Sequence, residues 1–211
     1  MLTGLLSGSA LWYLSRATGV VSVVLLTAVV VLGVVTAGRR SPHGTNATVV
    51  MALHRWLSLG MSAFLVAHIL TAILDGYVDI GLLATLVPFT SGYETLWVGI
   101  GTLAVDLLLA VVATSLLRSR ISEGAWRFVH WFAYAMWPLA VLHGVMMGSA
   151  DAPLLRYTTL ACGVVGILAT VMSTVVSYTF LGAVTLGRDV VWRARAETSE
   201  DSVTAPRNVY D

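Results

Sequence analysis

The fold is decided by residues 49–74, which read VVMALHRWLSLGMSAFLVAHILTAIL. This run is long and apolar enough to cross a membrane as one helix, because about 20 apolar residues span a hydrocarbon core of about 30 Å. It carries His54 and His68, fourteen positions apart. Fourteen steps of about 100° return to within about 40° of the starting direction, with an axial rise of about 21 Å. Both imidazoles are therefore expected on one helix face at two depths.

The composition indicates an integral membrane protein. Of the 211 residues, 57% are hydrophobic and 11% are charged, against about 25% charged residues in a soluble domain. A water-soluble fold would have too little polar surface, so we expect a lipid membrane as the surroundings and no nucleic acid as a partner. The single Cys162 excludes an internal disulfide and a cysteine-based metal site, and we interpret it as a small packing residue.

The hydropathy pattern predicts an all-α bundle of five transmembrane helices. A short apolar piece, Ile80–Phe89, is too short to cross and is expected to be re-entrant or to lie on the surface. No basic residue precedes the first apolar run, so a cleaved signal peptide is not expected. We predict a membrane domain over residues 1–186 and a polar, disordered tail over 187–211. The predicted spans are Leu11–Thr36, Val49–Leu74, Leu96–Leu117, Trp126–Met147 and one within Leu154–Leu186.

The orientation follows from the arginines, which collect in short cytoplasmic loops. The predicted outer side holds only Arg16 and Arg156, which places the amino terminus outside and the carboxyl terminus in the cytoplasm. The other ten of the twelve basic residues fall on the inner side: Arg39, Arg40, Arg55, Arg118, Arg120, Arg127, Arg188, Arg193, Arg195 and Arg207.

The second and fourth spans then run in the same direction, which pairs their histidines at two depths. We call His54 and His130 the inner pair, and His68 and His143 the outer pair. The fourth span does not fit an ideal helix, because thirteen steps of about 100° end about 140° away from the starting face. We expect a kink at Pro138, with local π or 3₁₀ turns, to correct this rotation.

Each pair supplies two imidazoles, and this number limits the possible ligands. A zinc ion would need three or four protein ligands, and neither level offers a carboxylate or thiol at the same depth. A haem iron needs only two axial ligands and, with two histidines, keeps no position open for oxygen or substrate. Single intramembrane histidines can also be hydrogen-bonded packing residues, but polar groups in hydrocarbon tend to mark function. Two stacked haems that carry electrons across the membrane are the expectation.

The spacing of the four histidines resembles the haem-ligand pattern of the ferric reductase and NADPH oxidase transmembrane superfamily. Three short stretches, Arg16–Gly19, Val87–Phe89 and Leu96–Gly99, are similar to small ferric-reductase-like membrane proteins of actinobacteria. The resemblance covers roughly residues 11–185. It implies two b-type haems with the four histidines as axial ligands, in a multi-pass protein of a bacterial plasma membrane. The sequence departs from the full-length members because it lacks a dehydrogenase domain and a glycine-rich dinucleotide fingerprint.

Several other residues are candidates for supporting roles. Haem propionates are anionic, so Arg16 at the outer end of the first span could hold one, as could Arg55 and Arg127 near the inner level. Each could instead be a topology determinant or a side chain that extends to the membrane surface. Asp106, in the middle of the third span, is expected to be protonated or hydrogen-bonded to a serine or threonine.

The fifth histidine and the large side chains between the two histidine levels have less specific interpretations. His43 is interpreted as a solvated loop residue. Between the two histidine levels lie four large side chains that we interpret mainly as core, one of which could shorten the distance for electron transfer: Met61, Phe64, Met136 and Trp137.

The predicted function is transmembrane electron transfer that reduces ferric iron or an extracytoplasmic partner. The chain has no expected flavin or nucleotide site, so the electron donor would be a separate flavoprotein or a membrane quinol. One alternative is the haem subunit of a two-component reductase, similar to the membrane partner of methionine sulfoxide reductase. Another is a non-enzymatic haem-binding scaffold or sensor. A redox titration separates electron transfer from the scaffold, and a copurifying flavoprotein would indicate a partner-dependent chain.

Overall fold

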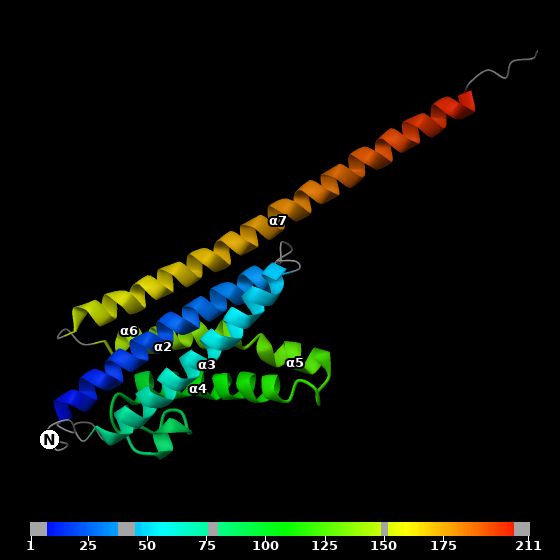
Figure 1. The fold of residues 1–211 in the computed structure, drawn as a ribbon. Helices are drawn as coiled ribbons and strands as arrows, with labels where there is room; N and C mark the ends of the chain where they lie inside the picture. The colour runs from blue at the N-terminus through cyan, green and yellow to red at the C-terminus, as the bar shows by residue number, and fades with distance from the viewer. Residues whose placement is uncertain (1–7, 38–44, 76–79, 149–151, 205–211) are drawn as a thin grey trace, which may run out of the picture. The chain divides into compact units, whose positions relative to one another are not determined.

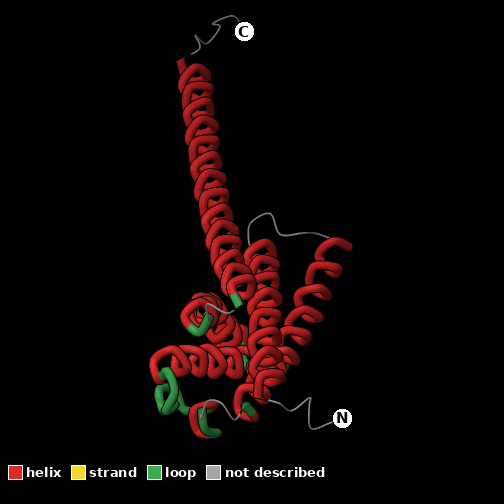
Figure 2. Tube along the Cα trace, turned by 90° about the vertical axis from the view of Figure 1, so that its left-hand side faces the viewer, coloured by secondary structure: helices red, strands yellow, loops and turns green. Residues whose placement is uncertain are grey.

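The computed structural model describes residues 8–37, 45–75, 80–148 and 152–204. Every regular element in these ranges is helical (Figures 1 and 2). In chain order the elements are α2 (Gly8–Ala37), α3 (Thr45–Leu74), the 3₁₀ turn η1 (Leu83–Thr85), α4 (Thr95–Leu116), α5 (Glu123–His130), α6 (Ala133–Met146) and α7 (Pro153–Thr204).

Among the described residues, five helical segments are long and apolar enough to cross a membrane, which confirms the predicted all-α membrane fold. Each segment overlaps one of the predicted spans, and none includes the short piece Ile80–Phe89. The side of the membrane on which each end lies stays a prediction from the arginine distribution. The segments are Ala10–Val34, Asn46–Leu74, Thr95–Leu116, Glu123–Met146 and Pro153–Val176.

The chain forms two compact units, residues 1–170 and 171–211. In the first unit, α2 packs along α3, α4 packs along α6, and α2 also contacts α6. Figure 1 shows α2 and α3 side by side. The two helices that carry the outer histidines, α3 and α6, are thus each supported by a helix without histidine. These supporting helices, α2 and α4, can supply backbone groups to the imidazoles.

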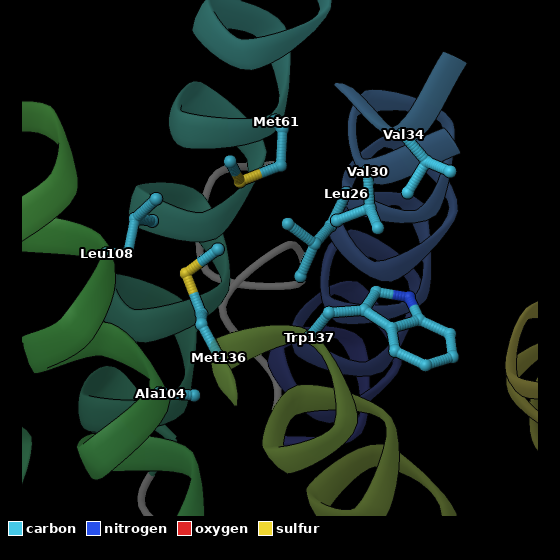
Figure 3. Packing of buried hydrophobic residues seen from close by; sticks show 8 residues of the cluster. All are labelled: Leu26, Val30, Val34, Met61, Ala104, Leu108, Met136 and Trp137. Carbon is cyan, nitrogen blue, oxygen red and sulfur yellow. The ribbon is translucent and has the colours of Figure 1, made fainter. Parts of the chain in front are cut away.

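The core of the first unit includes side chains that lie between the two histidine levels. Met61 is midway in sequence between His54 and His68, and its side chain is only 3% exposed. Figure 3 shows the side chains of Met61 and Met136 between the helices. The Trp137 indole nitrogen donates a hydrogen bond of 3.0 Å to the hydroxyl of Thr27. Phe64, in contrast, is 41% exposed and does not belong to this core. The buried cluster consists of Leu26, Val30, Val34, Met61, Ala104, Leu108, Met136 and Trp137.

The predicted span Trp126–Met147 is divided into α5 and α6 by a break at Trp131 and Phe132. Around the break, backbone N–H groups bond three residues back: Phe132 to Val129, Tyr134 to Trp131 and Ala135 to Phe132. These tight turns advance about 120° per residue, and the extra rotation moves the two histidines of this span toward a common face. The prediction of a kink at Pro138 is therefore wrong in position. The helix breaks at Trp131 and Phe132, whereas α6 continues through Pro138. Proline clashes with the carbonyl four residues earlier, here that of Tyr134, which lies beside the break.

The piece Ile80–Phe89 folds as turns around η1 and packs on α4. The hydroxyl of Thr102 donates a hydrogen bond of 2.6 Å to the carbonyl of Ala84, which is 2% exposed. Phe89 has a φ of 65°, an outlier for a bulky side chain, and its ring and backbone lie where a Cβ on Gly99 would be. The loop is therefore fixed to α4 by specific contacts.

The carboxyl-terminal segment differs from the predicted disorder, because α7 continues as helix to Thr204. Residues 192–200 read WRARAETSE, and alanine, arginine and glutamate favour helix, which explains how a polar segment can continue an apolar helix. Residues 205–211 lie outside the described residues. The division of the chain into a membrane domain ending at 186 and a polar tail stays a prediction.

Candidate functional site: two pairs of histidines

The outer pair joins His68 of α3 to His143 of α6, with ring centroids 6.3 Å apart and planes at 75°. Each ring is fixed by a backbone carbonyl of a neighbouring helix. The His68 Nδ1–H donates to the oxygen of Ser15 at 2.7 Å, and the His143 Nδ1–H donates to the oxygen of Trp97 at 2.8 Å. Because a carbonyl can only accept, each Nδ1 carries the hydrogen and each Nε2 keeps its lone pair. Both rings are therefore prepared to bind a metal through Nε2.

Two glycines make room for the outer rings. A Cβ on Gly19 of α2 would lie 2.8 Å from the Nδ1 of His68, and a Cβ on Gly101 of α4 would lie 2.6 Å from the Nδ1 of His143. Contacts this short do not occur between real atoms, so each ring can lie against its supporting helix only because a glycine is there. The glycines and carbonyls together determine the position of both imidazoles.

The inner pair joins His54 of α3 to His130 of α5, with ring centroids 6.4 Å apart and planes at 50°. His54 lies against α2, where its Cε1 would be 3.9 Å from a Cβ on Gly33. Among the described residues, the Nδ1 of His130 is buried without a hydrogen bond. Its ring instead stacks on Trp126, at a centroid distance of 4.8 Å and an angle of 24°. The structure thus brings the four histidines together in the predicted pairs, but supports the inner pair differently.

A cavity of ≈ 260 Å³ adjoins the outer pair. Most of its lining is apolar, and it extends inward as far as Met61 and Met136 without reaching the inner pair. Asp75, 5% exposed, is the acidic group in its wall. The cavity also receives two arginines, Arg16 and Arg156, from α2 and α7. A mostly apolar cavity with a few convergent polar groups is the usual form of a cofactor site.

The predicted arginines differ in their placement. Arg16 lies in the wall of the outer cavity, donates to the carbonyl of Met147 at 2.7 Å and covers the Trp12 ring at 4.2 Å. Arg55 and Arg127 are exposed, and Arg127 pairs with Glu123 one helical turn away. Neither lines the outer cavity.

Sequence reasoning missed Arg156 as a candidate site residue. Arg156 also lines the outer cavity, and its aliphatic stem packs beside Gly148. The sequence could have indicated Arg156, because only it and Arg16 lie on the predicted outer side, where arginines are otherwise absent.

The remaining predicted residues lie away from the cavity or outside the described ranges. Asp106 is half-buried on α4, and no hydrogen-bond partner for it occurs among the described residues, so the expected serine or threonine partner is not found there. Cys162 is buried in α7, as a packing residue would be. His43 lies outside the described residues.

The three short stretches that carry the sequence resemblance gather near the outer pair. Arg16–Gly19 supplies the cavity arginine and the glycine against His68, and Leu96–Gly99 contains the Trp97 carbonyl that accepts from His143. Val87–Phe89 ends in the ring that packs on Gly99. Segments far apart in the chain are thus parts of one structural site.

The fold and the site define a class: a multi-pass helical membrane protein with two levels of paired histidines. In the described part of the chain, no group of three or more His, Cys, Asp or Glu side chains is placed to hold a metal ion, so each level offers only two protein ligands.

Residues 18–141 match the family model for the ferric reductase like transmembrane component, which is more than half of the chain. The chain belongs to this family. Comparisons with curated proteins and with solved structures gave no significant match. Membership supports transmembrane electron transfer as the general class of function.

Proposed function

We propose that the protein transfers electrons across a membrane through two b-type haems, one held by each histidine pair. The observation that carries this proposal is the matched geometry of the pairs, with ring centroids 6.3 and 6.4 Å apart. A metal–imidazole bond of about 2 Å, added to the distance from nitrogen to ring centre, separates two rings on opposite sides of one metal by about 6 Å between centroids. Both pairs have this separation.

The nitrogen ligands that the four histidines offer also suit a haem iron. His68, His143, His54 and His130 would each offer Nε2 to the iron of a haem, and the porphyrin supplies the remaining four ligands. When bound, haem would supply a one-electron redox centre. The chain holds the outer imidazoles by backbone carbonyls, and such partners raise ligand basicity and fix ring orientation. Between the two levels, the side chains of Met61 and Met136 are buried.

Charged groups support an anionic cofactor at the outer level. Arg16 and Arg156 line the outer cavity and would neutralise carboxylates at its edge. Arg55 and Arg127 remain proposed contacts at the inner level, but their exposure and the Arg127–Glu123 ion pair favour a role at the membrane surface. The outer arginines are thus the better supported pair.

Electrons would enter at the inner pair from a cytoplasmic flavoprotein or a membrane quinol and leave at the outer pair. The acceptor would be ferric iron, reduced to the ferrous state by one electron, or an extracytoplasmic protein. This direction follows from the predicted cytoplasmic location of the arginine-rich loops. The proposed location, a bacterial plasma membrane, rests on the sequence resemblance alone.

The visible spectrum and haem content of the purified protein test this proposal. We expect two non-covalent b-type haems per chain, with the spectrum of six-coordinate, low-spin iron, because each iron would have two imidazole ligands. Pyridine haemochrome analysis against protein concentration gives the stoichiometry. A ratio of one haem per chain would contradict the two-site assignment, and five-coordinate, high-spin iron at both sites would contradict the ligands.

The second candidate function is the haem subunit of a two-component reductase. It is favoured by the family match, which describes a transmembrane component. We expect NADH or NADPH alone to leave both haems oxidised, and NADH with an added flavin reductase to reduce them, as followed by the absorbance of reduced haem. Dithionite provides the full-reduction control. Prompt reduction by NADPH without added protein would contradict the dependence on a separate donor.

A further inference from the structure

A stack of three side chains connects the inner pair to the surface at the α4–α5 connection. The guanidinium carbon of Arg118 lies 4.2 Å from the centroid of the Trp126 ring. Trp126 in turn stacks on His130, with the two ring centroids 4.8 Å apart. Arg118 is exposed, whereas Trp126 and His130 are half-buried. The Trp126 ring therefore contacts both an exposed cation, Arg118, and a proposed haem ligand, His130.

The local backbone explains why these groups align. The chain turns after α4, and the Ser122 hydroxyl caps α5 by accepting from the N–H of Ala125 at 3.2 Å. Trp126 and His130 are then four residues apart on the same short helix, so their side chains share a face. The capped turn holds Trp126 between the surface and the inner pair.

The same connection has an excess of positive charge. Arg127 is paired with Glu123, the acidic residue of α5. Arg118 and Arg120 are exposed, and among the described residues neither has a carboxylate within ion-pairing distance. Two uncompensated cations thus lie beside the stacked rings.

The two stacked rings also have buried nitrogen atoms without a hydrogen-bond partner among the described residues. Within the described ranges, the Nε1 of Trp126 and the Nδ1 of His130 are buried and have no hydrogen-bond partner. Such orphaned groups are uncommon in folded proteins. The buried ring nitrogens are out of reach of a docking protein, but the exposed cations Arg118 and Arg120 suit a partner that brings negative charge.

We propose that the α4–α5 connection is the docking surface for an acidic electron-donor protein, and that Trp126 positions the inner site for electron transfer from it. This inference rests on the proposed function. The donor's reduced flavin would lose two electrons in successive one-electron transfers, with its protons released to water. Each electron would pass to the inner pair, then to the outer pair, and finally to a ferric acceptor. A quinol is uncharged and would gain nothing from the exposed arginines.

Binding experiments test the docking surface on the full chain in nanodiscs of zwitterionic lipid. The probe is flavodoxin, an acidic flavin-carrying protein, used oxidised so that no turnover occurs. Replacing both Arg118 and Arg120 with glutamine should weaken binding about tenfold at low ionic strength. Salt near 0.5 M should remove this difference, because the screening length then falls to only a few ångströms.

Glu123→Gln should strengthen binding, because it leaves Arg127 uncompensated. Glu94→Gln, an exposed site before the first residue of α4, is the neutral control.

Stopped-flow reduction by reduced flavodoxin tests Trp126. Trp126→Leu should slow the first electron about tenfold, because small misplacements of reacting groups reduce rates strongly, while the dissociation constant stays unchanged. Trp126→Phe should restore most of the rate, since it keeps a ring to stack on His130. Electron paramagnetic resonance of the oxidised protein checks whether the inner ligands are still bound.

The outcomes separate this inference from the proposed function. Binding that is independent of salt and equal in all the arginine variants would overturn the docking surface and favour quinol as the donor. Equal reduction rates in Trp126→Leu and the unaltered chain would overturn the role of Trp126. A purified protein without haem would contradict the proposed function, but the binding measurement needs no haem and would still decide whether the surface docks an acidic protein.

Discussion

Alanine at His68 or at His143 is expected to remove the same haem and to halve the haem content. The two rings face each other in the outer pair, so loss of either leaves one axial ligand for that iron. Alanine at His54 or His130 should remove the other haem, because these rings form the inner pair. Potentiometric titration followed by absorbance would show one component lost in each variant, and the same component within a pair.

The remaining haem serves as the internal control for folding, since a misfolded chain would lose both. Helix content by circular dichroism gives a second check. If His54→Ala and His143→Ala removed the same redox component, α3 would have to run opposite to the α5–α6 segment, and the pairing described here would be wrong. Retention of both components in any single alanine variant would remove that histidine from the set of ligands.

Gly101→Ala is expected to disturb the outer haem without changing any ligand. The added Cβ would lie 2.6 Å from the Nδ1 of His143, and the ring cannot move away without losing its hydrogen bond to the carbonyl of Trp97. Losing a partner of this kind lowers metal affinity by about 10- to 100-fold. Gly19→Ala should act in the same way through His68, where the Cβ would lie 2.8 Å from Nδ1.

Gly60→Ala is the matched control for both glycine variants. Gly60 lies on α3, between the two histidines of that helix, and the nearest atom to its added Cβ would be 3.9 Å away. Alanine there should be tolerated, because alanine is favoured over glycine within a helix. Haem retention and midpoint potentials would be measured in all three variants. An unchanged outer component in both Gly101→Ala and Gly19→Ala would show that close contact with the supporting helices does not hold the rings.

Much of the architecture could be predicted because its causes are local. Length and hydropathy predicted five helical spans, and each overlaps a helical segment of the structure. The spacing of His54 and His68 predicted a common face, because an uninterrupted helix keeps its period. The same reasoning failed for the fourth span, where the break at Trp131 and Phe132 lies before Pro138. The sequence shows the proline, but the residue at which the helix is interrupted depends on the packing of its neighbours.

Features that depend on contacts between helices could not be predicted. Arg156 lines the outer cavity only in the folded first unit, and Phe64 is outside the core because its helix turns it outward. The stack of Arg118 on Trp126 depends on the turn between α4 and α5. Exposure and stacking are properties of the packed bundle, so a linear pattern of residue types does not contain them.

By itself, the sequence determined that this protein is a helical membrane protein with four histidines grouped at two depths, because hydrophobic length and helical period are local properties. Only the tertiary structure decided which groups orient those histidines. The acceptors for His68 and His143 are backbone carbonyls of Ser15 and Trp97. Every residue has such a carbonyl, so no side-chain pattern can mark the one that will accept. Its selection follows from the way α2 and α4 pack against the helices that carry the outer pair.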